Sequence, residues 1–257
     1  MENLHISGLQ YDIIWESPEQ NLQYLEEILL SSLSSSDIMI LPEMFTTGFT
    51  MNAQNYAETM DGPVVKWLSK MAKLHNCHMA GSLAIKINNS SETYANRLIW
   101  SMPDGQIKWY DKHHLFSVGG EHKIYTPGNN HLTITVKGWR IRPFICYDIR
   151  FPTWTRNTKP YYDVSIFIAN WPSKRAHHWK TLLTARAIEN QSYVVGINRI
   201  GVDGRNILYQ GDSLIIDPQG QTVINAGKSS KIISHSMSYD SIQNWREVFP
   251  VLEDQKP

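Results

Sequence analysis

The sequence predicts a mixed α/β protein, because β-rich apolar segments alternate with amphipathic helical segments along its whole length. Its 257 residues are enough to bury a substantial core. No internal repeat, low-complexity tract or shift in composition marks a domain boundary. We therefore expect one domain that spans residues 1–257.

The N-terminal part predicts two strands and two helices. Leu4–Gln10 is the first strand, and Ser17-Pro18-Glu19-Gln20 carries the N-cap serine, first-turn proline and capping glutamine of a helix start. Ile38–Leu41 is a continuous apolar run, typical of a strand covered on both faces. Asp61-Gly62-Pro63 opens a second helix. The apolar stripes of these helices are Leu22, Leu25, Leu29 and Leu33, and Val64, Leu68, Met71 and Ala72.

The rest of the chain predicts further strands and one long helix. Cys77–Ile87 and Thr93–Trp100 flank Asn88-Asn89-Ser90-Ser91, which indicates a hairpin or adjacent antiparallel strands. A helix is predicted from about Ala176 to Asn190. The turn signals at 203–204 and 218–220 separate strands near the C-terminus. The other predicted strands are 106–110, 139–145, 163–169 and 193–198.

Composition and charge exclude several classes of protein. Lys and Arg together number 24 and Asp and Glu also number 24, so no net field attracts nucleic acid or an anionic membrane. No run approaches the roughly 20 apolar residues of a membrane helix, and the first ten residues do not resemble a signal peptide. Cys77 and Cys146 form no C-x-x-C motif, which fits a reducing compartment. We expect a cytoplasmic protein that binds neither nucleic acid nor a membrane.

Three predicted strand ends carry residues suited to covalent hydrolysis. Cys146 follows a strand, and a sharp turn there would expose its sulfur and direct the Tyr147 backbone N–H at an oxyanion. Glu43 follows Ile38–Leu41 and could act as a general base. The ammonium group of Lys112 could stabilise an oxyanion. Taken singly, each has a plain alternative: a buried structural cysteine, a loop glutamate and a surface lysine. Cys77 begins an apolar strand and is interpreted as structural.

Blocks of sequence around these residues resemble the nitrilase, or carbon–nitrogen hydrolase, superfamily. The three main blocks are Leu41-Pro42-Glu43, Tyr110-Asp111-Lys112-x-His114-Leu115-Phe116 and Cys146-Tyr147-Asp148-x-Arg150-Phe151-Pro152. Asn170-Trp171-Pro172 and the segment 186–191 agree with later blocks. The resemblance implies an α-β-β-α sandwich and a Glu43–Lys112–Cys146 triad. The chain looks most similar to the omega-amidase branch, which hydrolyses 2-oxoglutaramate and related omega-amides.

The resemblance also implies supporting groups and a partner. Glu121, ahead of a Tyr-x-Pro-Gly block, corresponds to a second glutamate that would support Lys112, although an exposed loop residue remains the alternative. A homodimer is implied, with the apolar segment of about 239–257 at its interface, and packing of this segment against its own subunit is the alternative. Arg186 and Glu189 lie three residues apart on the predicted helix and are interpreted as a structural buried pair.

A substrate with a distal carboxylate needs a cation and an apolar wall. Arg175 is the candidate cation, and Phe116 and Trp171 are the candidate walls, with a solvated loop as the alternative for Arg175. The ten histidines form no H-E-x-x-H motif, and no Gly-rich phosphate loop is present, so neither a metal nor a cofactor is expected.

The predicted function is hydrolysis of a small-molecule amide through a cysteine thioester. Two other enzyme activities stay open, an N-carbamoyl-amino-acid hydrolase and an aliphatic amidase. An inactive binding protein of the same fold is a further alternative, which the intact Glu43, Lys112 and Cys146 disfavour. A class I glutamine amidotransferase fits less well, because Ile145 and Tyr147 flank the cysteine where that class has glycines.

Overall fold

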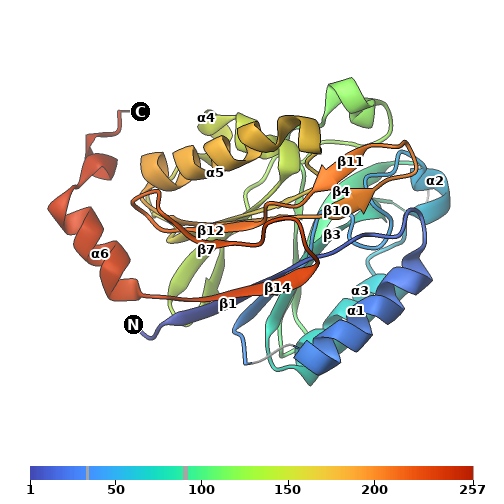
Figure 1. Cartoon of the computed structure of the whole chain (residues 1–257), viewed down its shortest axis with the longest axis horizontal. Helices are drawn as coiled ribbons and strands as arrows, with labels where there is room; N and C mark the ends of the chain where they lie inside the picture. The colour runs from blue at the N-terminus through green and yellow to red at the C-terminus, as the bar shows by residue number, and fades with distance from the viewer. Residues whose placement is uncertain (33–34, 89–91, 257) are drawn as a thin grey trace.

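The computed structural model describes residues 1–32, 35–88 and 92–256. Within these residues the chain forms two six-stranded sheets that pack face to face, with helices on both outer faces (Figure 1). This arrangement is the α-β-β-α sandwich that the family resemblance implies, so the predicted fold class is confirmed.

The first sheet has the strand order β14-β1-β2-β3-β4-β5. β1, β2 and β3 run parallel to one another, and the remaining neighbours pair antiparallel. The two segments predicted as a hairpin pair as β3 and β4, whereas residues 89–91 of the predicted turn lie outside the described residues. The strands are β1 (Leu4–Gln10), β2 (Ile38–Ile40), β3 (His78–Lys86), β4 (Tyr94–Ser101), β5 (Ile107–Asp111) and β14 (Lys231–Met237).

The second sheet has the order β13-β12-β9-β8-β7-β6, with β7, β8 and β9 parallel. A separate hairpin, β10 (Ile200–Val202) and β11 (Leu208–Gln210), contains the turn predicted at 203–204. The turn predicted at 218–220 joins β12 to β13. The strands of the sheet are β6 (Ile134–Val136), β7 (Trp139–Ile145), β8 (Val164–Ala169), β9 (Tyr193–Asn198), β12 (Leu214–Ile216) and β13 (Thr222–Asn225).

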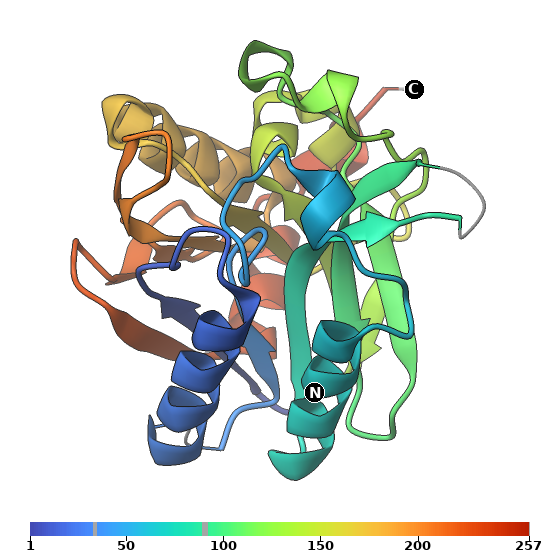
Figure 2. The same cartoon turned by 90° about the vertical axis from the view of Figure 1, so that its right-hand side faces the viewer.

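Amphipathic helices cover the outer faces. α1 (Pro18–Ser32) and α3 (Pro63–Leu74) lie side by side against the first sheet (Figure 2), and α5 (Ala176–Asn190) covers the second. The predicted stripe of α3 is buried; in α1, Leu25 and Leu29 are buried, Leu22 is half-buried, and Leu33 lies outside the described residues. Each fully buried leucine stabilises the fold by about 2 kcal/mol. The shorter helices are α2 (Ala53–Tyr56), α4 (Pro152–Thr155) and α6 (Tyr239–Val248).

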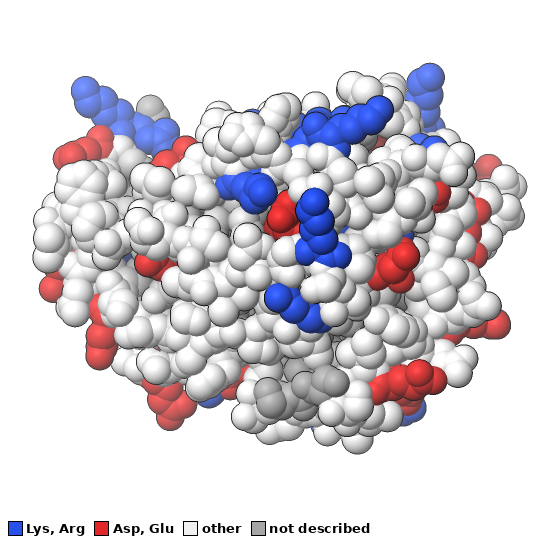
Figure 3. Space-filling view, in the orientation of Figure 1, with Lys and Arg blue, Asp and Glu red and all other residues white. Residues whose placement is uncertain are grey.

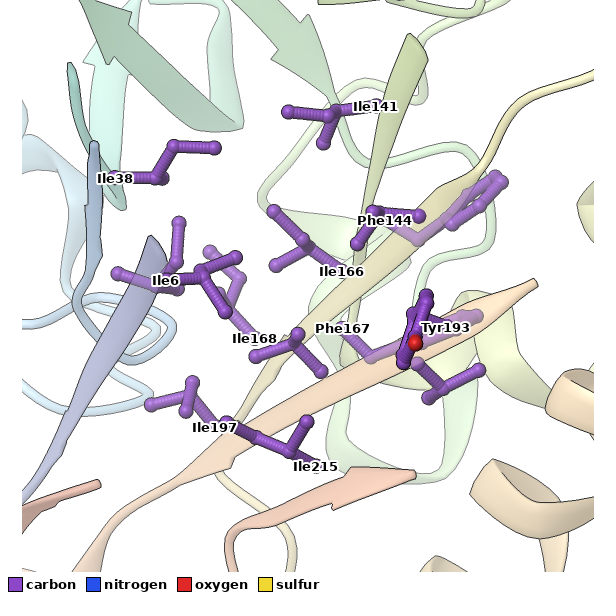
Figure 4. Close-up of a cluster of buried hydrophobic side chains, with 14 of the residues drawn as sticks. Ile6, Ile38, Ile141, Phe144, Ile166, Phe167, Ile168, Tyr193, Ile197 and Ile215 are labelled. Carbon is purple, nitrogen blue, oxygen red and sulfur yellow. The ribbon is translucent and has the colours of Figure 1, made fainter. Parts of the chain in front are cut away.

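The main core lies between the two sheets. Ile6 and Ile38 of the first sheet face Ile166, Ile168 and Ile197 of the second (Figure 4). These side chains are at most 1% exposed. Such close packing fixes the relative position of the two sheets, and therefore of the strand ends that carry polar groups.

The distribution of surface charge agrees with the equal numbers of basic and acidic residues in the sequence. Basic and acidic side chains are interspersed over the face drawn in Figure 3, rather than collected into one charged field. In the described part of the chain, no helix combines the length and the apolar character that crossing a membrane requires.

Candidate active site

One pocket collects residues from the ends of strands in both sheets. Glu43 follows β2 and Lys112 follows β5 in the first sheet, whereas Cys146 follows β7 in the second. All three line a pocket that encloses about 590 Å³, including space open to solvent. The other residues singled out from the sequence at this pocket are Phe116, Tyr147, Trp171 and Arg175. The convergence expected from three separate strand ends is therefore observed.

Cys146 sits on a sharp turn from strand to helix. It begins the 3₁₀ turn η3 (Cys146–Arg150) with a φ of +44°, in the left-handed region that non-glycine residues rarely adopt. Buried Asp148 accepts hydrogen bonds from the Ile145 backbone N–H at 3.1 Å and from the Tyr110 hydroxyl at 2.7 Å. Asp148 thus ties the turn to β5, the strand that precedes Lys112. The half-buried sulfur faces the pocket.

Arg186 holds the same turn from the opposite side. Its Nε and Nη2 atoms donate to the Ile149 carbonyl at 3.0 and 2.6 Å, and its Nη1 donates to Glu189 at 2.7 Å. The Arg186 side chain is 5% exposed and that of Glu189 is 40% exposed. The predicted ion pair is present, but the prediction that both members are buried is wrong, because Glu189 is exposed. Buried Arg186 anchors the backbone that carries Cys146.

A fully buried charge cluster lies beside the cysteine. The Lys112 Nζ atom is 2.8 Å from Glu43 Oε1 and 2.9 Å from Glu121 Oε2, and all three side chains are 0% exposed. Gly128 of the Tyr-x-Pro-Gly block packs on the backbone before Lys112, where an added Cβ would lie 2.5 Å from the Asp111 carbonyl oxygen. Because the Glu121 side chain is 0% exposed, the alternative interpretation of Glu121 as an exposed loop residue is wrong.

Uncharged donors complete the cluster. The Asn96 side-chain amide donates to Glu43 Oε1 at 2.8 Å and to Glu121 Oε1 at 3.1 Å. The Asn170 backbone N–H donates to Glu43 Oε2 at 2.8 Å, and the Phe116 N–H donates to Glu121 Oε2 at 2.6 Å. The sequence analysis missed Asn96, which stands in β4 next to a second polar residue, Arg97, and has no local feature that sets it apart.

Burial and mutual charge set the protonation of the cluster. Burial raises the pKa of the Cys146 thiol well above its ordinary value, and Glu43 adds to this rise while Lys112 opposes it. Burial alone would lower the pKa of Lys112, but the charges of Glu121 and Glu43 outweigh burial and raise it. Burial also raises the pKa of Glu121, against the opposing charge of Lys112. The cluster thus holds a neutral thiol beside a charged lysine.

The outer part of the pocket is aromatic and cationic. The Arg175 guanidinium lies 5.5 Å from the centre of the Phe116 ring, and the Trp171 indole donates to the Arg175 carbonyl at 2.8 Å. Arg150 and Arg205 also line the pocket, and sequence reasoning had given neither a role. The Arg150 guanidinium lies over the Trp171 ring at 4.7 Å.

Cations outnumber free carboxylates along this pocket. Its charged lining residues are Lys112, Arg150, Arg175 and Arg205 against Glu43 and Asp203. Asp203 already accepts hydrogen bonds from the Tyr209 hydroxyl at 2.9 Å and from two backbone N–H groups of its own turn. An anionic molecule therefore meets more cationic than anionic side chains along this pocket.

Among the described residues, no group of three or more His, Cys, Asp and Glu side chains could hold a metal ion. His114 instead lies with its Nδ1 3.0 Å from Asp148 and stacks on Phe151 with ring centres 3.7 Å apart. The expectations of no metal and no cofactor stay predictions.

A cysteine at a strained strand end, beside a buried carboxylate and a buried lysine in an α-β-β-α sandwich, is an arrangement suited to hydrolysis by a cysteine nucleophile. The sequence model of the family described as carbon-nitrogen hydrolase matches residues 6–247. The chain belongs to this family.

Similar proteins cover nearly the whole chain. An omega-amidase of Escherichia coli, YafV, is 40% identical over 255 residues, which span 99% of this chain and 97% of the relative. A 2-oxoglutaramate amidase of Bacillus subtilis is 37% identical over 253 residues, 97% of this chain and 96% of the relative. The crystal structure of XC1258 from Xanthomonas campestris, a CN-hydrolase superfamily protein with an arsenic adduct in its active site, has a TM-score of 0.96 and 40% identity, covering 100% of this chain and 98% of that one. The chain is accordingly an amide-hydrolysing enzyme that acts on a small molecule.

Proposed function

We propose that this enzyme is an omega-amidase that converts 2-oxoglutaramate, 2-oxosuccinamate and similar compounds into the dicarboxylic 2-oxo acid and ammonia. The observation that carries the proposal is the half-buried Cys146 beside the buried Glu43 and Lys112, in a pocket that is also lined by Arg150, Arg175 and Arg205. An omega-amide of this kind carries its amide at one end and a carboxylate at the other. The relatives named omega-amidase and 2-oxoglutaramate amidase, at 40% and 37% identity, support the same substrate class.

In the first half of the proposed reaction, Glu43 takes the Cys146 thiol proton as the sulfur attacks the amide carbon. The carbonyl electrons move to oxygen, and the oxyanion is stabilised by Lys112 and by the Tyr147 backbone N–H. An ammonium group has three N–H donors; two of those on Lys112 serve Glu43 and Glu121, and the third is left for the oxyanion. Collapse of the oxyanion breaks the C–N bond as Glu43 gives its proton to the nitrogen. Ammonia then departs, and the acyl group remains on Cys146 as a thioester.

In the second half, Glu43 takes a proton from water as the water oxygen attacks the thioester carbon. A second oxyanion forms at the same donors. Its collapse breaks the C–S bond, the Cys146 sulfur regains a proton from Glu43, and the acid is released. Glu43 thus alternates between base and acid, whereas Glu121 supports Lys112 without touching the substrate.

Ammonia release from a panel of amides tests the proposed substrate class. We expect the highest kcat/KM for 2-oxoglutaramate and 2-oxosuccinamate, and lower values for glutamine, asparagine and a neutral aliphatic amide. Faster hydrolysis of an N-carbamoyl amino acid, with carbon dioxide as a second product, would identify the enzyme as an N-carbamoyl-amino-acid hydrolase. A preference for the neutral amide would identify an aliphatic amidase, and no ammonia from any compound would indicate a binding protein.

Arg175 is the proposed partner of the substrate carboxylate, with Phe116 and Trp171 as walls for the carbon chain. We expect Arg175→Ala to raise the KM for 2-oxoglutaramate about 10–100-fold, the effect of losing hydrogen bonds to a charged group. Hydrolysis of a neutral short-chain amide should be almost unaltered. Lys174→Ala is the matched control, because Lys174 precedes Arg175 but is exposed and lies outside the pocket lining.

Equal effects of Arg175→Ala on both substrates, or no effect on either, would remove Arg175 from this role. Arg150→Ala and Arg205→Ala, measured in the same way, then identify which of the other two pocket arginines binds the carboxylate.

We also propose a cytoplasmic homodimer with the segment 239–257 at its interface. Within the described part of this segment, Ile242 and Leu252 pack against their own subunit, while Val248 and Phe249 are 79% and 52% exposed. α6 lies at one end of the molecule, beside the end of α5 (Figure 1). Exposed apolar side chains of this size favour an interface.

Light scattering at micromolar concentration tests the dimer. We expect twice the chain mass for the wild type, and the mass of one chain for the double variant Val248→Asp/Phe249→Asp. Leu30→Asp is the control, because Leu30 is 59% exposed on α1. A monomeric wild type would contradict the proposal, and dimers in the double variant would move the interface elsewhere.

A further inference from the structure

Asn96 lies on β4 and forms hydrogen bonds with Glu43, Glu121 and Lys112, the three residues of the buried charge cluster. None of the site residues predicted from the sequence follows this strand. The Asn96 Nδ2 atom donates to Glu43 at 2.8 Å and to Glu121 at 3.1 Å. Its backbone carbonyl accepts the Lys112 N–H at 2.9 Å. The side chain is 0% exposed, so water does not replace these contacts.

The buried charge cluster contains two acids, Glu43 and Glu121, but one cation, Lys112. Two ionised carboxylates and one ammonium leave a net negative charge in a space closed to water, where unbalanced charge is costly. In such a pair of carboxylates one member tends to take up a proton. The Asn96 amide has two N–H donors, and each is directed at one of the two acids. An amide supplies this stabilisation without adding a charge or a proton that the acids could remove.

The other end of the Asn96 side chain points to the same conclusion. Its Oδ1 atom is buried and has no hydrogen-bond partner among the described residues. A buried acceptor without a partner destabilises the folded protein. The donor end, which faces the two acids, is therefore the part of this side chain that the site uses.

We infer that Asn96 is a positioning residue that keeps Glu43 and Glu121 ionised on either side of Lys112, so that Glu43 stays free to accept the Cys146 proton. This inference rests on the role of Glu43 in the proposed function. The other titratable groups around the two acids are Lys112, Cys146, Tyr125 and Tyr209. Burial holds the pKa values of both tyrosines above their ordinary value, so they stay neutral across the working range.

The test is the pH dependence of kcat/KM. Each donated hydrogen bond favours the ionised form of an acid, so its loss raises the pH at which the pair takes up a proton. We expect Asn96→Ala to move the acid limb of the profile upward by about one pH unit and to lower kcat about 10–100-fold. Asn96→Ser keeps a single donor and should give a smaller shift in the same direction. KM should change little, because Asn96 does not line the pocket.

Asn157→Ser is the matched control. Asn157 is equally buried, and its amide donates to the carbonyls of Tyr162 and Asn190 at 2.9 Å, away from the cluster. It should lose thermal stability and leave the acid limb unmoved. If the acid limb of the profile does not move in a folded Asn96 variant, Asn96 has a structural role and the inference is wrong. The same conclusion follows if both Asn96 variants fail to fold while Asn157→Ser folds.

The profiles are measured with whichever amide the wild type hydrolyses fastest. Rejection of 2-oxoglutaramate by the wild type would therefore overturn the proposed substrate, whereas it would leave the comparison of acid limbs intact.

Discussion

Replacing Cys146 by serine is expected to abolish ammonia release, with residual turnover at least about 10⁴-fold below wild type, because a hydroxyl is a much poorer nucleophile beside a carboxylate base. The substitution changes one atom, and the half-buried site tolerates an oxygen in place of sulfur. The melting temperature should therefore stay close to that of the wild type. Steady-state assays with 2-oxoglutaramate, together with thermal unfolding, measure both effects.

Cys77 is the internal control for this prediction. It is 1% exposed, lies immediately before β3 and does not line the pocket that contains Cys146. Cys77→Ser should therefore leave turnover nearly unchanged. Labelling the native enzyme with iodoacetamide should modify one thiol, at Cys146, in step with loss of activity. Inactivation that follows modification of Cys77 instead would overturn the assignment of the nucleophile.

The sequence was sufficient to predict several strands and the longest helix of the second sheet's outer face. β1, β7, β9 and α5 begin and end at the predicted residues. These segments have strong local signals, namely continuous apolar runs or an amphipathic stripe bounded by turn residues. The short strands of the C-terminal third were not assigned, because three or four residues carry too little periodicity to be distinguished from a loop. The ten-residue helix α6 was not assigned either.

The convergence of Glu43, Lys112 and Cys146 on one pocket was predictable, because each residue follows the end of a strand. Burial was not predictable for Glu121, because its loop is rich in glycine and its carboxylate is covered by contacts with Asn96 and Lys112, which lie in other segments of the chain. Asn96, Arg150 and Arg205 were missed because their roles depend on which separate segments form one pocket. Such contacts between distant segments leave no local pattern in the sequence.

Glu43 and Lys112 should prove as indispensable as the nucleophile. We expect Glu43→Gln to lower kcat about 10²–10⁴-fold, because the amide cannot accept the thiol proton. Lys112→Ala removes the charged oxyanion donor and should lower kcat about 10²–10³-fold. It also leaves two buried carboxylates without their cation, which should cost about 3–5 kcal/mol of folding stability. Lys174→Ala, at an exposed lysine near the pocket, serves as the control.

The double variant separates a cooperating triad from two independent contributions. If Glu43 and Lys112 act on the same proton transfer and oxyanion, removing either already disables the step that the other assists. Glu43→Gln/Lys112→Ala should then be about as slow as the slower single variant, rather than slower by the product of the two losses. Turnover is compared at a temperature where thermal unfolding confirms that every variant is folded. A single variant with nearly wild-type kcat would take that residue out of the chemical steps. Fully multiplicative losses would mean that Glu43 and Lys112 assist different steps, despite the 2.8 Å between their charged atoms.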